Sequence, residues 1–143
     1  MPDTFDLERF VTAQQPVYAR VCAELADGHK RTHWMWFVFP QLKGLGSSSL
    51  ARTYGLASAQ EARAYLAHPL LGERLRDCAG LLLQVRGADA RQVMGYPDDL
   101  KLRSSMTLFA AAAIATSDQR LFAGVLAKFF AGVEDPLTRE LLT

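Results

Sequence analysis

The sequence has few cysteines, little net charge and no long hydrophobic run. Its two cysteines, Cys22 and Cys78, are far apart and lack metal-ligand spacing, so we expect buried thiols in a reducing compartment rather than a disulfide framework. The formal net charge of +1 implies no general attraction to nucleic acid or to a membrane surface. The longest small-apolar run, LFAAAAIA, is far shorter than the roughly 20 residues of a membrane span.

The sequence also shows no sign of a targeting segment or of an interdomain linker. The first ten residues, MPDTFDLERF, are acidic and lack the apolar stretch of a signal peptide, so the expected location is cytoplasmic. The 143 residues contain no repeat and no low-complexity segment, and half of them are hydrophobic. This is the size and composition of one globular domain, so we expect a single domain over residues 1–143.

Most of the chain has apolar residues at helical spacing, whereas the alternation typical of strands is almost absent. SAQE is a capping box, in which Ser58 can bond the amide of Glu61 and Glu61 can reach back, and Pro69 is well placed to begin another helix. We predict an all-α, compact single domain of seven or eight mostly antiparallel helices. We expect Asp98 or Asp99 to cap DLKLRSSMTLFAAAAIA, Ser117 to cap DQRLFAGVLAKFFAG, and Phe109, Leu126 and Phe129 to lie in the core.

The segment KRTHWMWFVFPQLKGLGSSSL places four aromatic residues within six positions. Two interpretations fit it. Trp34 and Trp36 could both be core residues, or one indole could form the wall of a ligand pocket, because a buried indole N–H needs a partner in either case. The five residues MWFVF are too few to distinguish a strand from a helix. We expect Trp34 or Trp36 to be mostly buried.

The loop QLKGLGSSS has features of an anion site. Gln41, Lys43 and Ser47 accompany two glycines, and the helix SSLARTYG would direct free N–H groups toward this loop. The GKS/T and GxGxxG spacings of the known phosphate loops are missing. A plain capping loop explains the same residues equally well.

A second polar cluster, GYPDDLKLRSSMT, precedes a nearly apolar helical stretch. Asp99 and Arg103 could form an i,i+4 surface pair, but serines and an arginine in a buried helix need polar partners. A cavity shared with the aromatic segment would supply them. We therefore expect Trp36 or Gln41 to lie near Arg103 or Ser104, with Lys101 also facing the ligand.

His33 is the best acid–base candidate among three histidines, because it adjoins Trp34 and two basic residues. A histidine bound to a nearby carbonyl is the alternative. Asp98 and Asp99 are the acidic candidates. His29 and His33 have no third ligand, so we expect no metal, and nothing in the pattern indicates a cofactor.

The long motifs HWMWFVFPQLKGLGSSSLARTYGLASAQEARAYLAHPLLGERL and GYPDDLKLRSSMTLFA closely resemble the bacterial family catalogued as domain of unknown function 1810. The resemblance extends from LERFVTAQQPVY to FFAGVEDPLT and implies a mainly helical fold with no established activity. Some members are labelled calpastatin-like, but an inhibitor that folds on binding should be polar and disordered, and this chain is apolar and capped. The fragment LAHPLLGERL is loosely similar to small helical domains that act on ADP-ribose and riboflavin intermediates, and it also fits a helix boundary.

These features favour a protein that binds a small phosphorylated or nucleotide-like ligand and acts on it by hydrolysis or group transfer. Aromatic faces would stack on a ring, and basic side chains would meet the anionic part. The alternative is a non-enzymatic interaction module that docks a protein through an aromatic patch. A closed cleft favours the ligand, and a flat exposed patch favours the partner. The sequence leaves the oligomeric state open.

Overall fold

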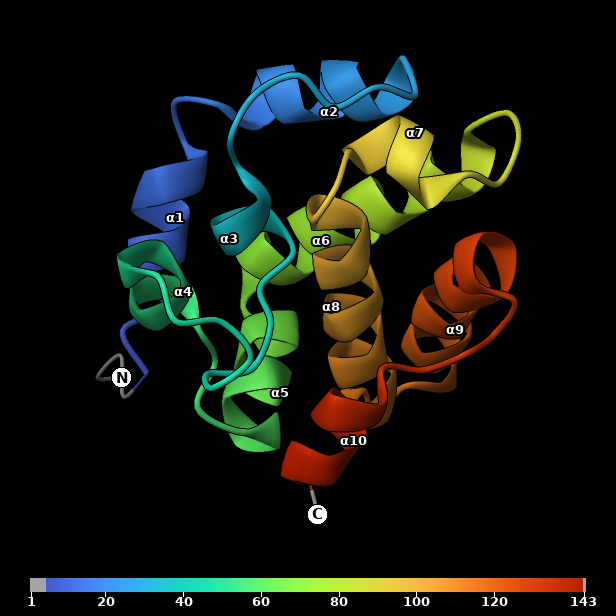
Figure 1. The fold of residues 1–143 in the computed structure, drawn as a ribbon. Coiled ribbons are helices and arrows are strands. Elements are labelled where there is room, and N and C mark those ends of the chain that lie inside the picture. The colour runs from blue at the N-terminus through green and yellow to red at the C-terminus, as the bar shows by residue number, and fades with distance from the viewer. Residues whose placement is uncertain (1–4, 143) are drawn as a thin grey trace.

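The structure, a computed structural model, describes residues 5–142, which form ten helices and no sheet (Figure 1). The all-α prediction is confirmed. Seven helices have seven or more residues, in line with the seven or eight expected. Three shorter helices bring the total to ten. None of the helices in this part of the chain has the length and apolar character needed to cross a bilayer. The helices are α1 (Glu8–Gln14), α2 (Tyr18–Ala26), α3 (Met35–Val38), α4 (Ser49–Tyr54), α5 (Ala59–Ala67), α6 (Pro69–Gln84), α7 (Ala90–Met94), α8 (Asp98–Ala112), α9 (Thr116–Phe130) and α10 (Pro136–Leu142).

The core lies among α5, α6, α8 and α9, with α8 and α9 forming an antiparallel hairpin (Figure 1). Phe109 of α8 has its ring centroid 5.8 Å from that of Phe122 and 5.5 Å from that of Tyr65, so aromatic contacts link three of these helices. Phe109 is fully buried, and Leu126 and Phe129 are 3% and 9% exposed. The predicted core positions are therefore confirmed.

Two helix starts follow the expected local chemistry. The Ser58 hydroxyl accepts a hydrogen bond from the Glu61 amide at 3.2 Å, and the Glu61 carboxylate reaches back to the amide of Ala57 at 2.8 Å. His68 caps α6, because its Nδ1 accepts from the amides of Leu70 and Leu71, each at 3.2 Å. LAHPLLGERL is thus a helix boundary in this fold.

Two predicted caps are wrong. α9 begins at Thr116 with Ala115 as its N-cap and no side-chain hydrogen bond, so Ser117 lies inside the first turn. α8 follows Pro97, and neither Asp98 nor Asp99 caps it. Their carboxylates instead lie in the first turn, where they complement the positive end of the helix.

The residues after α3 form a flap, defined here as residues 43–55, that carries α4. A parallel bridge between Leu42 and Leu56 closes its base: the Lys43 amide donates to the Leu56 carbonyl at 2.8 Å, and the Leu56 amide to the Gln41 carbonyl at 2.9 Å. α4 has no buried residue. A Cβ at Gly55 would approach Lys43 Cγ to 2.5 Å, so glycine lets the two ends of the flap touch.

Candidate functional site

The site is built on a buried carboxylate, Glu24 of α2, which organises the segment before α3. Glu24 is 5% exposed and accepts hydrogen bonds from the Arg31 amide at 2.9 Å and from the Thr32 amide and hydroxyl at 3.1 and 2.7 Å. The indole N–H of Trp34 donates to the same carboxylate at 2.9 Å. Trp34 is 1% exposed and belongs to the core.

These contacts keep Glu24 ionised. Burial alone would raise the pKa of this carboxyl, because the charged form loses hydration. The hydrogen bonds from Arg31, Trp34 and Thr32 outweigh burial and hold its pKa at about 2. Glu24 therefore fixes the direction in which the chain enters α3.

A chain of charges links this segment to the start of α8. Lys30 donates to Asp98 at 2.8 Å and lies 5.0 Å from the ring centroid of Trp34. Asp98 also faces Lys101 at 3.7 Å, and the Lys101 ammonium lies 4.7 Å from the ring centroid of Trp36. Each tryptophan ring thus has a lysine ammonium over its face, and the carboxylate of Asp98 pairs with both lysines.

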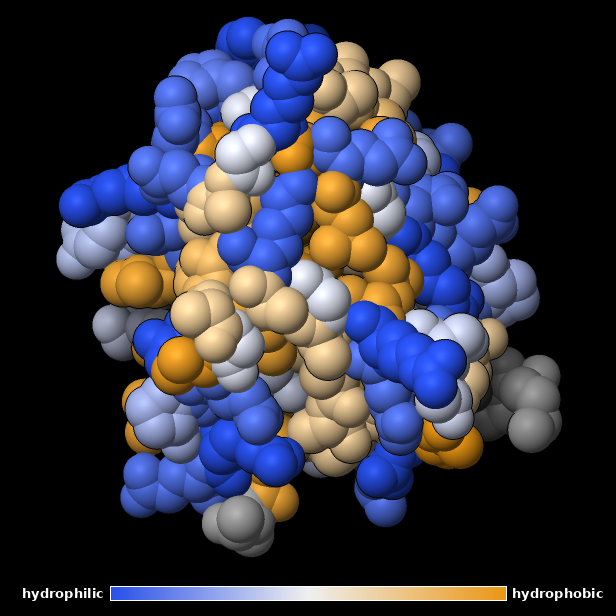
Figure 2. Space-filling view, turned by 90° about the vertical axis from the view of Figure 1, so that its right-hand side faces the viewer, coloured by the Kyte–Doolittle hydropathy of each residue, from blue (hydrophilic) through white to orange (hydrophobic). Residues whose placement is uncertain are grey.

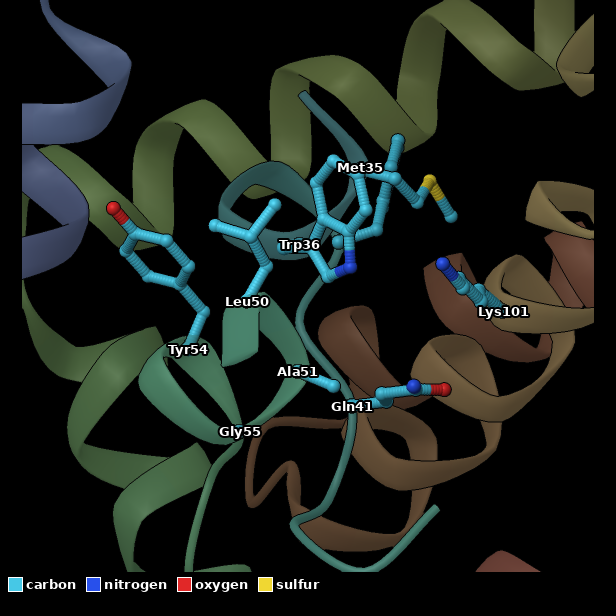
Figure 3. Close-up of a pocket in the computed structure, with 9 residues that line it drawn as sticks. Met35, Trp36, Gln41, Leu50, Ala51, Tyr54, Gly55 and Lys101 are labelled. Carbon is cyan, nitrogen blue, oxygen red and sulfur yellow. The ribbon is translucent and has the colours of Figure 1, made fainter. Parts of the chain in front are cut away.

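A narrow pocket lies between α3, the flap and α8 (Figure 3). Trp36 lies between Leu50 and Tyr54 of the flap on one side and Lys101 on the other. The free space is about 10 Å³, close to that of one water molecule, so a larger ligand requires the flap to move. The lining residues are Met35, Trp36, Phe39, Gln41, Leu50, Ala51, Tyr54, Gly55 and Lys101.

Trp36 carries an unpaired donor at this pocket. Its indole Nε1 is buried and has no hydrogen-bond partner, which is unusual for a buried polar atom. Figure 3 shows this nitrogen on the side of the ring that faces Lys101. Because an indole N–H and an ammonium are both donors, the pair would favour a ligand that presents an acceptor or an anion.

Several predicted ligand-binding residues lie elsewhere. Lys43 is exposed beside a separate groove that Leu141 also lines, and Ser47 is exposed at the start of the flap helix. The Ser48 hydroxyl accepts from the Ala51 amide at 3.1 Å, and the Ser47 carbonyl accepts from Arg52 at 2.6 Å. Ser48 of this loop thus caps α4, while Gln41 at the start of the loop lines the pocket.

Arg103 and Ser104 do not line the pocket, contrary to expectation. The Arg103 guanidinium donates to the carbonyls of Val133 and Glu134 at 2.9 and 2.7 Å, and Ser104 bonds Asp135 at 3.2 Å. These two side chains hold the segment between α9 and α10. The two polar sequence clusters do share a pocket, but Lys101 is the residue of α8 that reaches it.

None of the three predicted catalytic residues lines the pocket. His33 is exposed, and Asp98 is paired with Lys30. The alternative i,i+4 pair of Asp99 with Arg103 does not form, because the Arg103 guanidinium is bound to backbone carbonyls. The Oδ1 of Asp99 is buried without a partner.

Sequence reasoning missed Glu24, Lys30 and Tyr54. A signal existed for Glu24, because a carboxylate within the apolar stripe of α2 indicates buried partners. Lys30 and Tyr54 gave no such signal, since their roles depend on the packing of α8 and α4. The two cysteines, distant in sequence, lie on α2 and α6, which pack against each other.

The fold and the pocket define a small all-α domain with a tryptophan-walled slot beneath a flap. The chain belongs to the family described as protein of unknown function DUF1810, whose family model matches residues 4–142, as the sequence motifs predicted. It is similar to the crystal structure of the conserved hypothetical protein Rv1873 from Mycobacterium tuberculosis, with 58% identity, 98% of each chain covered and a TM-score of 0.93. Comparison with curated proteins found no match. These likenesses assign a fold and a family and name no activity.

Proposed function

We propose that this protein binds a small anionic ligand, phosphorylated or nucleotide-like, in the slot beneath the flap. The observation that carries the proposal is the buried, unpartnered Nε1 of Trp36 beside the Lys101 ammonium. An acceptor on the ligand would satisfy the indole donor, and a negative charge would pair with a lysine that is 25% exposed.

The rest of the pocket suits a flat ring. Trp36, Phe39 and Tyr54 supply aromatic surface, Met35 and Leu50 supply apolar surface, and the lysine stands at one side (Figure 3). Ligand pockets commonly combine apolar walls with a few polar groups that fix orientation. A nucleobase or a similar ring would contact the walls while a phosphate or carboxylate reaches Lys101.

The lining residues favour binding over chemistry. The pocket has a phenol, an amide, an indole and an ammonium, and among the described residues that line it there is no carboxylate, imidazole or thiol. Hydrolysis or group transfer usually needs a general base within hydrogen-bonding reach of the substrate. We therefore propose ligand binding itself and assign no catalytic residue.

A docking module with an aromatic patch has less support. Within residues 5–142, Tyr96 is the aromatic side chain among the strongly exposed large hydrophobic ones, at 64% exposure. Ile114 and Val133, which flank α9, are exposed but aliphatic. Figure 2, which views the molecule from the α9 side, shows apolar residues lying among hydrophilic ones.

The test is a thermal-shift titration with AMP, ADP-ribose and flavin mononucleotide, with adenosine as the uncharged control. A ligand that binds the native state raises Tm as the ligand concentration increases. At a hundredfold excess over Kd, it adds about 2.7 kcal/mol to the free energy of unfolding. We expect at least one phosphate-bearing compound to raise Tm more than adenosine, and less so at high salt. No shift from any anionic compound at millimolar concentration would exclude this ligand class.

Trp36→Phe is the matched variant for this titration. It keeps an aromatic ring in the slot and removes the indole donor. We expect the variant to fold and to lose most of the ligand-induced shift. An undiminished shift would show that binding takes place away from the slot.

A further inference from the structure

Arg9 of α1 joins the flap to the body of the protein. Its Nε donates to the Thr53 carbonyl in the last turn of α4 at 2.9 Å, and its Nη2 lies 3.4 Å from the Gly55 carbonyl at the end of the flap. The same Nη2 donates to the Glu61 carboxylate of α5 at 2.9 Å. Figure 1 shows α4 next to α1. One guanidinium therefore bridges the flap, α1 and α5.

The Arg9–Glu61 pair is the fixed half of this contact. The two side chains are only 18% and 4% exposed, and Glu61 is also bonded to the amide of Ala57. The Nη1 of Arg9 donates to the carbonyls of Phe5 and Asp6, just before α1. The planar fork of a guanidinium can serve several acceptors at once. Arg9 is thus positioned by α5 and by its own helix start, independently of the flap.

The flap is the mobile half. Residues 43–53 include no buried residue. Apart from the Arg9 bond at Thr53, α4 contacts the body through Tyr54, whose ring centroid lies 5.7 Å from that of Phe10 and 5.5 Å from that of Phe37. Segments with few buried contacts open locally at a small free-energy cost. The flap can therefore leave the body while the core stays folded.

The base of the flap gives this movement a hinge. Leu42 and Leu56, which form the bridge, are 5% and 0% exposed, so the base is anchored in the core. Gly44 follows the base on one side with φ 97°, and Gly55 precedes it on the other. Hinges are commonly a few loop residues at such element ends.

We propose that Arg9 is a latch that holds the flap closed over Trp36 and so controls access to the slot. The closed slot has about 10 Å³ of free space, so a ring can enter only when α4 lifts. Lifting α4 separates the Thr53 carbonyl from Arg9, while the Arg9–Glu61 pair stays in place. Arg9 does not line the slot and is a positioning residue. Its effect on ligand affinity rests on the proposed function, but the closure itself does not.

The first test needs no ligand. Hydrogen–deuterium exchange of peptides covering residues 43–55 is compared between the wild type and Arg9→Lys. Lysine keeps the charge beside Glu61 but lacks the fork that also reaches the flap. We expect the flap amides to exchange at least about threefold faster in the variant, with α8 and α9 unchanged. Unchanged flap exchange, or an equal increase in α8, would overturn the latch.

Arg52→Lys is the matched control. Arg52 lies on the flap itself, and its guanidinium donates to the Ser47 carbonyl within the flap at 2.6 Å. Its replacement removes a guanidinium without breaking the bond between Arg9 and α4. We expect flap exchange close to that of the wild type. An increase as large as that in Arg9→Lys would contradict the role of Arg9.

The second test uses the ligands. Stopped-flow tryptophan fluorescence follows the binding of AMP, ADP-ribose and flavin mononucleotide to both proteins. A closed flap lowers the apparent affinity by the fraction of open molecules, so Arg9→Lys should bind faster and about three- to tenfold more tightly. A compound that binds the variant no faster and no more tightly would overturn the control of access and leave the ligand site intact. Binding of none of the three would instead refute the proposed function, and the exchange data would still decide the latch.

The wild type supplies the decisive measurement if Arg9→Lys does not fold. Its flap amides should exchange faster than those of α8, at a rate that 1 M urea leaves almost unchanged, because a local opening exposes little surface. Flap amides that exchange only through global unfolding would overturn the proposal.

Discussion

The ammonium of Lys101 lies 4.7 Å from the centroid of the Trp36 ring, at the edge of the slot beneath the flap. Asp98 connects this lysine to Lys30, which lies 5.0 Å from the ring of Trp34. Trp34 is a core residue whose indole N–H donates a hydrogen bond to Glu24. Trp36 lines the pocket, and its indole N–H has no hydrogen-bond partner. The aromatic segment is therefore both core and pocket wall, divided between two tryptophans two positions apart.

Lys101→Met should weaken binding of an anionic ligand. The substitution keeps an apolar side chain against Trp36 and removes the charge. Because the ammonium is partly exposed and shared with Asp98, we expect a loss of about 1.4 kcal/mol, which is tenfold in Kd. Isothermal titration with the phosphate-bearing compound that gives the largest thermal shift measures it.

Lys43→Met is the matched control. Lys43 carries the same charge but is exposed at the base of the flap, outside the pocket lining. Its Kd should stay within about twofold of the wild type. If Lys43→Met weakens binding as much as Lys101→Met, the anion is held at the loop rather than in the slot.

Glu24→Gln should destabilise the fold and reduce its sensitivity to acid. The amide cannot accept all four hydrogen bonds that the carboxylate accepts, so we expect a loss of about 1–3 kcal/mol at pH 7. The pKa of Glu24 is about 2 in the folded state against 4.5 as its ordinary value. Its contribution is therefore complete above pH 4.5 and is lost as the pH falls toward 2.

Urea melts from pH 7 down to pH 2 measure this difference. The gap in unfolding free energy between wild type and Glu24→Gln should narrow below pH 4.5. Asp27→Asn is the control, because its carboxylate is 58% exposed in a surface pair with Arg31 and should be worth less than about 1 kcal/mol. A gap between wild type and Glu24→Gln that stays constant with pH would contradict the role given to the ionised carboxylate.

Local signals in the sequence predicted the helices well and the site only in part. Ser58 and Glu61 lie three positions apart, so their capping bonds depend on nearby residues alone. The choice between Lys101 and Arg103 depends on the rotation of α8 and on the position of residues 133–134, which attract the guanidinium. Pairing across distant helices has no short-range pattern, so the sequence alone does not predict it.

Phe129→Ala should destabilise the protein by about 3–5 kcal/mol, because it leaves a cavity on the core side of α9. Urea denaturation measures the loss. Leu137→Ala is a useful comparison, since Leu137 is 46% exposed and its truncation should cost much less. Equal effects from the two substitutions would refute the assignment of the buried face of α9.

Ala131→Gly should stabilise the protein. Ala131 ends α9 in the left-handed conformation, with φ 54° and ψ 29°, which costs a residue with a Cβ about 1–2 kcal/mol. Glycine adopts this conformation without that cost but loses more backbone entropy on folding, so we expect a net gain of about 0.5–1 kcal/mol. Ala127→Gly, at an exposed position inside the same helix, should instead destabilise the protein by about 1 kcal/mol. Urea melts of the two variants should therefore shift in opposite directions, and shifts of the same sign would contradict the role of position 131 in ending the helix.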